Sequence, residues 1–69
     1  MNETINISII AKNIKAIRMS HSLTQLEMAK ILGYTERTIR RLETDGTDNI
    51  SVINLIASTF NIPAISILS

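Results

Sequence analysis

A nine-residue stretch near the middle of the chain, TERTIRRLE, contains three arginines: Arg37, Arg40 and Arg41. Guanidinium groups are permanent cations with fixed N–H donors, and they bind carboxylates and phosphates through paired hydrogen bonds. At 100° per residue, a helix places these arginines on one side and Ile39 and Leu42 on the other. The stretch therefore predicts a short helix that is held by two apolar residues and presents a cationic face outward.

A helix this short is not stable alone, so neighbouring helices must hold it in place. Apolar residues recur at helical spacing in most of the chain, and nothing in the pattern indicates a strand. We expect an all-α bundle of about five short helices. Their expected ranges are from a cap at Ser8 to about 19–21, about 24–32, about 36–43, from a cap at Asp48 or Asn49 to Asn61, and 64–68.

The signals at the helix ends are strongest around the arginine-rich stretch. Thr24-Gln25-Leu26-Glu27 has the form of a capping box at the start of one helix, and Gly33 can adopt the positive φ that ends it. Thr35 then caps the arginine-rich helix. Leu26 and Ala29, together with Ile31 or Leu32, are expected to face inward.

Composition narrows the functional class. Sixty-nine residues make one domain near the lower size limit for folding alone. The absence of cysteine and the single histidine, His21, exclude a disulfide framework and leave the usual metal sites without ligands. There is no apolar run of membrane-spanning length, no basic signal-peptide start, no nucleophile–histidine–acid set and no glycine-rich phosphate loop. We therefore expect a cytoplasmic protein that is not an enzyme and binds no cofactor.

Charge is distributed unevenly. All seven Lys and Arg residues lie between Lys12 and Arg41, so the first 41 residues have a net charge of +4, whereas the rest carry only three acidic side chains. A domain polarised in this way can turn one face toward a polyanion. The alternative is a solvated surface whose charges are merely uneven.

Two capped helices joined by the very short Gly33-Tyr34 turn, the second with a polar outer face, describe a helix-turn-helix. The segment SLTQLEMAKILGYTERTIRRLE resembles the helix-turn-helix of the phage-repressor and Cro family, also called Xre-type regulators. The matching features are Leu23-Thr24-Gln25, Ala29, Leu32-Gly33, Thr38-Ile39, Leu42-Glu43, the upstream Ile14 and Arg18, and the downstream Ile56-Ala57, Phe60-Asn61-Ile62. The resemblance covers about residues 9–68. The chain departs from the family at Ser22, where Gly is common, and at 44–49, which holds no Pro and no basic residue.

The resemblance implies a lambda-repressor-like fold whose arginine-rich helix enters the DNA major groove. It implies base reading by Thr35, Glu36, Arg37 and Arg40, and phosphate binding by Gln25, Thr38, Arg41 and Thr47. It also implies a largely buried ion pair between Arg18 and Glu43. Alternatives stay open for four of these residues. Glu36 only pairs with Arg40 four residues on, Thr35 only caps its helix, Gln25 is only an exposed helix former, and Arg37 contacts a phosphate or pairs with a glutamate on the surface.

The resemblance implies a sequence-specific regulator of bacterial or phage origin, a repressor that binds a palindromic operator as a homodimer. Residues 1–8 are expected to form an arm and residues 9–69 the domain. The apolar segment Ile62–Leu68 is the candidate dimer surface, with capping of the core as the alternative. Two other functions remain: a protein-interaction module such as an antitoxin, and the DNA-binding part of a longer regulator controlled by a ligand or a peptide.

Overall fold

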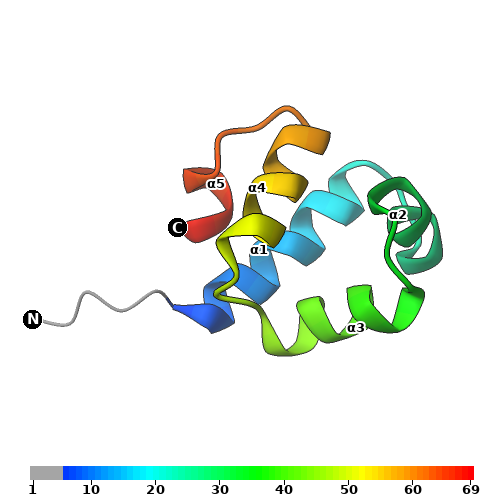
Figure 1. The fold of residues 1–69 in the computed structure, drawn as a ribbon, viewed down its shortest axis with the longest axis horizontal. Helices are drawn as coiled ribbons and strands as arrows, with labels where there is room; N and C mark the ends of the chain where they lie inside the picture. Colours follow the sequence, from blue (N-terminus) through cyan, green and yellow to red (C-terminus); the bar gives the residue numbers. More distant parts are fainter. Residues whose placement is uncertain (1–5) are drawn as a thin grey trace, which may run out of the picture.

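The computed structural model describes residues 6–69, which form five α-helices and, within that range, no strand (Figure 1). The helices are α1 (Ile7–Ser20), α2 (Gln25–Leu32), α3 (Glu36–Asp45), α4 (Ile50–Thr59) and α5 (Ile65–Leu68). The predicted all-helical class is confirmed. The longest helix, α1, is central: it contacts α3 on one side and α5 on another, while α2 packs on α3.

The start of α1 differs from the expectation. The cap is Asn6 rather than Ser8: its side-chain oxygen accepts a hydrogen bond from the Ile9 amide at 3.2 Å. Asparagine is among the strongest N-caps, and this cap adds Ile7 and Ser8 to the helix. Ile7 and Ser8, which were expected to belong to the arm at 1–8, are therefore part of α1. Residues 1–5 of that arm lie outside the described residues.

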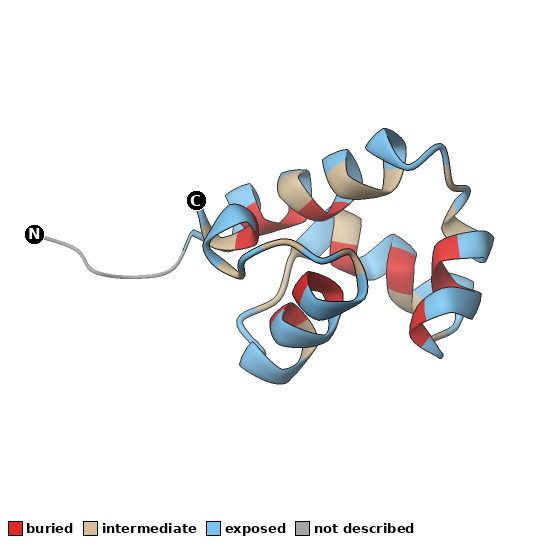
Figure 2. Cartoon of the chain, turned by 90° about the horizontal axis from the view of Figure 1, so that it is seen from above, coloured by how far each residue is buried: buried red, intermediate tan, exposed pale blue. Residues whose placement is uncertain are grey.

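The core is aliphatic and lies where all five helices converge. Seven side chains have less than 2% of their surface exposed: Ile10, Ile14, Met28, Ile39, Ile53, Ile56 and Ile67. Figure 2 shows these buried positions on the inward sides of the helices, with exposed residues covering the outside. Full burial of each such side chain stabilises the fold by roughly 1.5–3 kcal/mol relative to exposure.

The inward face of α2 is only partly the one expected. Ala29 and Leu32 are buried as predicted, but Leu26 is 46% exposed. The core stripe is formed by Met28, Ala29 and Leu32. At 100° per residue, Leu26 and Ile31 lie more than about 100° from the centre of that stripe, one on each side, and both are left in solvent.

One turn requires glycine for two independent reasons. Gly46, after α3, has φ of 74°, in the region that L-residues rarely adopt. A Cβ atom at this position would also collide with the backbone carbonyl of Ile7. The residue after α3 therefore lies directly against the first residue of α1, an approach that a side chain would prevent.

The C-terminal helix α5 docks on α1 through one buried side chain and one hydrogen bond. Ile67 is fully buried, and the Asn13 side-chain amide donates to its carbonyl at 2.8 Å. Ile62 and Leu68 are half-buried against the core, whereas Ile65 is 62% exposed. The segment proposed as a dimer surface is thus partly core, and Ile65 is its principal outward apolar residue.

Candidate nucleic-acid interface

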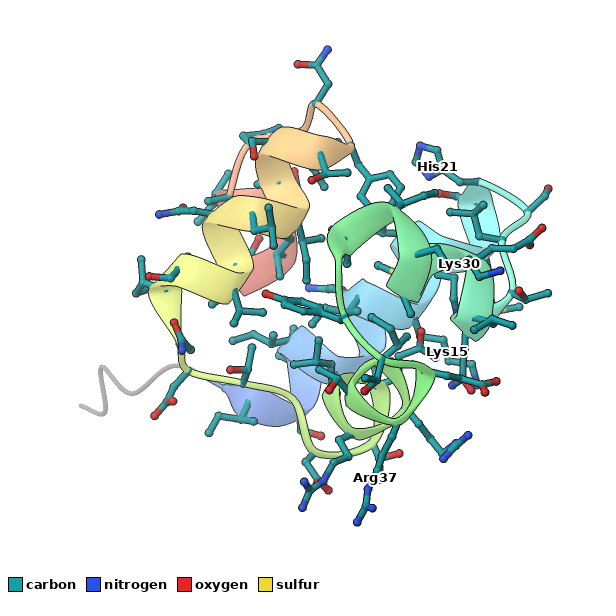
Figure 3. All side chains as sticks on the ribbon, turned by 45° about the vertical axis from the view of Figure 1, so that its right-hand side comes forward. Lys15, His21, Lys30 and Arg37 are labelled. Atoms are coloured by element: carbon teal, nitrogen blue, oxygen red, sulfur yellow. The ribbon has the colours of Figure 1, made fainter. Side chains whose placement is uncertain are left out.

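Helix α3 has two chemically distinct sides. Ile39 and Leu42 are buried, with 0% and 8% of their surface exposed. The exposed residues of this helix include Glu36, Arg37, Arg40 and Arg41. Figure 3 shows Arg37 projecting from α3 away from the body of the domain. Two apolar contacts therefore anchor the helix while its three arginines remain in solvent.

The turn before α3 is set by caps on both sides. At the start of α2, the Thr24 hydroxyl accepts from the Glu27 amide at 3.0 Å, and the Glu27 carboxylate accepts from the Thr24 amide at 2.8 Å. Gly33 ends α2 with φ of 79°. Only Gly33 and Tyr34 separate Leu32 from the Thr35 cap, so the two helices are held at a defined angle.

The Glu27 carboxylate is stabilised by this capping box. Hydrogen bonds from Thr24, the backbone amide first, hold the pKa of Glu27 below its ordinary value. The ionised form is therefore the one that caps α2. Its negative charge also lies at the positive end of the helix dipole.

The two threonines at the start of α3 are paired with each other. The Thr35 hydroxyl accepts from the Thr38 amide at 3.1 Å and lies 2.9 Å from the Thr38 hydroxyl. The Thr35 hydroxyl is thus engaged in capping α3. Thr38 is half-buried and lies one turn behind it on the same side of α3.

Glu36 and Arg40 are neighbours on the exposed face. Their closest charged atoms, Oε1 and Nη2, are 3.9 Å apart, and both side chains are about half exposed. Exposed pairs at this i,i+4 spacing contribute only about 0.3–0.5 kcal/mol. The pair is therefore weak enough for either residue to exchange its partner for a ligand group.

Arg18 and Glu43 lie in direct contact between the end of α1 and the end of α3. Arg18 Nε donates to Glu43 Oε2 at 2.6 Å and Nη2 to Oε1 at 3.0 Å, so the pair is bidentate. Only 14% of the Arg18 side chain and 4% of the Glu43 side chain are exposed. The hydrogen bonds to Glu43 raise the pKa of Arg18, which remains charged throughout the accessible range.

Sequence reasoning did not predict two further partners of this ion pair. Arg18 Nη1 donates to the Leu23 carbonyl at 2.8 Å, and Gln25 Nε2 donates to Glu43 Oε1 at 3.2 Å. For the Leu23 carbonyl a signal was available, since a guanidinium has five N–H donors and one carboxylate does not satisfy them all. The network joins the ends of α1 and α3 to the beginning of α2.

The predicted phosphate-binding residues are spread over three segments. Gln25 is the first residue of α2, and Thr38 and Arg41 belong to α3. Thr47 lies in the loop after α3, where its hydroxyl accepts from the Asn49 amide at 3.0 Å. The four predicted base-reading residues, by contrast, are gathered within the first half of α3 and its cap.

Two other functional features are missing from residues 6–69. No group of three or more His, Asp or Glu side chains in that range is placed to hold a metal ion. Among the same residues, no helix is both long enough and apolar enough to cross a membrane. The outward arginines of α3 and the capped start of α2 are thus the chemically distinctive surface of the described chain.

Comparison with known proteins agrees with this geometry. A family model described as helix-turn-helix matches residues 14–64, which span α2, α3, α4 and the second half of α1. The antitoxin PezA of Streptococcus pneumoniae serotype 4 is 41% identical over 61 residues, which are 86% of this chain and 38% of that protein. The chain thus spans well under half the length of this curated relative. The matched residues contain the whole two-helix unit with its caps, and the chain belongs to the Cro/C1-type helix-turn-helix family.

Proposed function

We propose that this chain binds double-stranded DNA in a sequence-specific manner as a transcription regulator, with α3 in the major groove. The observation that carries the proposal is the exposed arginine face of α3. Ile39 and Leu42, on the opposite side of the helix, are buried and hold it in place. Membership of a helix-turn-helix family supports it. In such a unit the second helix enters the groove and the first crosses the backbone.

The two long side chains Arg37 and Arg40 are the main candidates for base reading. Arginine binds guanine through two hydrogen bonds, to O6 and N7, and each such pair discriminates by about 1–3 kcal/mol. Glu36 can accept from cytosine N4 once it leaves Arg40. Because the hydroxyl of Thr35 is engaged in the cap, we assign Thr35 a smaller part in reading.

Phosphate binding falls to Gln25, Thr38, Arg41 and Thr47. Arg41 is exposed beside the reading residues and supplies the charge. Gln25 lies at the start of α2, where backbone N–H groups and the helix dipole favour an anion. Thr47 is the weakest member, since Asp45 at the end of α3 and Asp48 in the following loop lie close to it in the chain and repel phosphate.

The regulator acts as a repressor and binds a palindromic site as a homodimer, with half-sites about one helical turn apart. The proposed contact is α5, where Ile65 is 62% exposed. Residues 49–69 contain no charged side chain, so copies meeting about a two-fold axis there bring no like side-chain charges together. Ile65→Lys is expected to leave a monomer by mass in solution, with folding unchanged; a dimer that survives Ile65→Lys would place the contact elsewhere.

The DNA proposal is tested by selecting duplexes from a random pool with the purified chain at about 150 mM salt. Arg37→Ala is run alongside, with Lys12→Ala as a control that removes the same charge from α1. We expect a palindromic motif that Arg37→Ala loses or relaxes and Lys12→Ala retains. Recovery of no motif by the folded wild-type chain would contradict sequence-specific binding by this chain alone.

A second candidate is favoured by the similarity to a protein named as an antitoxin. In that case the domain is part of a longer antitoxin, in which it binds DNA or a protein partner. It could equally be part of a longer regulator that a ligand or a peptide controls. Dependence of partner binding on Arg37 and Arg40 separates the alternatives. A protein partner that binds equally well after both arginines are changed to alanine would use a different surface from the one proposed for DNA.

A further inference from the structure

The Glu43 carboxylate has a partner that the ion pair does not require. Its two oxygens accept three hydrogen bonds, two from Arg18 and the third from Gln25 Nε2 at 3.2 Å. With 4% of the side chain exposed, the carboxylate is almost entirely enclosed by these donors and the surrounding helices. The Gln25 bond therefore links the first residue of α2 to the last turns of α3, the helix that carries the arginines.

The position of Gln25 gives this bond a consequence for anion binding. The capping box satisfies the amides of Thr24 and Glu27. The backbone amides of Gln25 and Leu26, in the same first turn, have no acceptor within the helix. A phosphate that approaches this end of α2 therefore meets two outward backbone N–H groups together with the Gln25 side chain.

A free glutamine would be poorly suited to hold such a phosphate. Its last torsion is broad, and its amide can present either the nitrogen or the oxygen outward. Ordering a glutamine side chain costs on the order of 1 kcal/mol or more in rotamer entropy. An ionised carboxylate accepts hydrogen bonds and donates none, so Glu43 selects the nitrogen of the Gln25 amide and holds it.

We propose that Glu43 is a positioning residue, which orients the Gln25 amide so that its second N–H donates to a DNA phosphate. The inference rests on the proposed DNA-binding function and assigns it a contact that is organised before DNA arrives. Arg18 neutralises the Glu43 carboxylate, so that the carboxylate does not repel the phosphate. Glu43 belongs to α3, the helix proposed to read the bases. Its side chain therefore positions the phosphate contact of α2 relative to the base contacts of α3.

A double-mutant cycle on DNA affinity tests the positioning role. The probe is a mixed-sequence duplex at low salt, since phosphate contacts do not depend on sequence. The chains are the wild type, Gln25→Ala, Glu43→Gln and the double variant, compared at a temperature where circular dichroism shows all four folded. We expect Gln25→Ala and Glu43→Gln each to weaken binding about threefold to tenfold per protomer. In the Gln25→Ala background, Glu43→Gln should have little further effect.

A Glu43→Gln effect of the same size in both backgrounds would overturn the proposal, because a purely structural role does not act through Gln25. If the wild-type chain binds no duplex, the proposed function itself fails. If Glu43→Gln does not fold at any temperature, a measurement on the wild-type chain alone decides the positioning claim.

That measurement is the mobility of the side-chain amide by nuclear magnetic resonance. Gln25 is the only glutamine in the chain, so its side-chain signal can be assigned directly. Asn13, whose amide donates to the Ile67 carbonyl at 2.8 Å, serves as the ordered reference, and Asn54 on the exposed side of α4 serves as the mobile one. We expect the Gln25 amide to be as ordered as that of Asn13 in the absence of DNA. Mobility equal to that of Asn54 would overturn the positioning role.

Discussion

Residues 12–48 carry every charged side chain of the described range, whereas residues 49–69 carry none. In the charged region, α1, α2 and α3 meet around the ion pair of Arg18 and Glu43. In the neutral region, α4 and α5 are held by buried isoleucines, with one hydrogen bond from Asn13. The hydrogen bonds of the charged region are directional, whereas apolar burial is not.

This difference matches what each region presents to solvent. Helix α3 is held at a defined angle to α2 by a bidentate ion pair that has a carbonyl and an amide as further partners. The neutral region exposes Ile50 at 52% and Ile65 at 62% with no charged side chain among them. Its surface suits contact with a second neutral surface, and we expect its interior to tolerate changes of side-chain shape that conserve volume.

The largest effect is expected from Glu43→Ala. It leaves the Arg18 guanidinium in a nearly enclosed site without its counterion, which costs about 3–5 kcal/mol. The thermal midpoint should fall by more than about 10 °C, as followed by circular dichroism. Replacing both partners, in Arg18→Met with Glu43→Met, should restore part of the loss because no buried charge then remains. An unchanged midpoint in Glu43→Ala would remove the contrast between the regions.

In the neutral region, Ile67→Ala should lower the free energy of unfolding by about 3 kcal/mol, because it removes a fully buried side chain through which α5 packs on α1. Ile67→Leu, which conserves volume, should cost less than about 1.5 kcal/mol. The exposed neighbour Ile65→Ala is the matched control and should lie within about 0.5 kcal/mol of the wild type. Denaturant unfolding measures all three. Equal losses for Ile67→Leu and Ile67→Ala would show that shape matters here as strictly as in the charged region.

A gain of stability is expected from Ser22→Gly, in the loop between α1 and α2. Ser22 has φ of 56°, and so does not adopt the backbone that serine prefers. Glycine relieves this strain, with a net gain of about 0.5–1 kcal/mol after its own entropy cost. Asn61 has φ of 55° in the neutral region, but asparagine tolerates this conformation, so Asn61→Gly should gain less. A larger gain at Asn61 would contradict this explanation.

The smallest expected effect is on the stability of the fold at acidic pH. The lowered pKa of Glu27 means that its capping contribution is fully present above the ordinary pKa that this carboxyl group has in the unfolded chain. It is lost as the pH falls through the lower, folded pKa. Glu27→Gln keeps an acceptor for the Thr24 amide but has no charge to lose. The wild type should lose more stability than Glu27→Gln between neutral pH and acid; parallel curves would show that the cap does not depend on charge.

Local patterns predicted the elements of this domain well. The capping box at Thr24, the stop at Gly33 and the cap at Thr35 are chemical signatures that act within four residues, so they are readable without the rest of the fold. They located α2 and α3 to within two residues, and the largest difference is the extension of α3 from about 43 to Asp45. The cap of α1 was misplaced because Ser8 and Asn6 are both acceptable caps, and only the observed hydrogen bond distinguishes them.

Burial was less predictable than helix position. Leu26 and Leu32 are chemically alike, yet one is 46% exposed and the other 8%. Which side of a short helix faces the core depends on how the other helices approach it, and periodicity over eight residues leaves that angle poorly determined. The same reason divides α5, where Ile65 faces out and Ile67 faces in.

The sequence by itself determined the all-helical class, the two capped helices with their short turn, and the separation of arginines from apolar residues on α3. These follow from local hydrogen bonding and from a period of 3.6 residues. Only the tertiary structure decided that Arg18 also binds the Leu23 carbonyl, that Gln25 donates to Glu43, and that Gly46 lies against Ile7. Those contacts join residues from different elements, so their geometry exists only once the helices have packed.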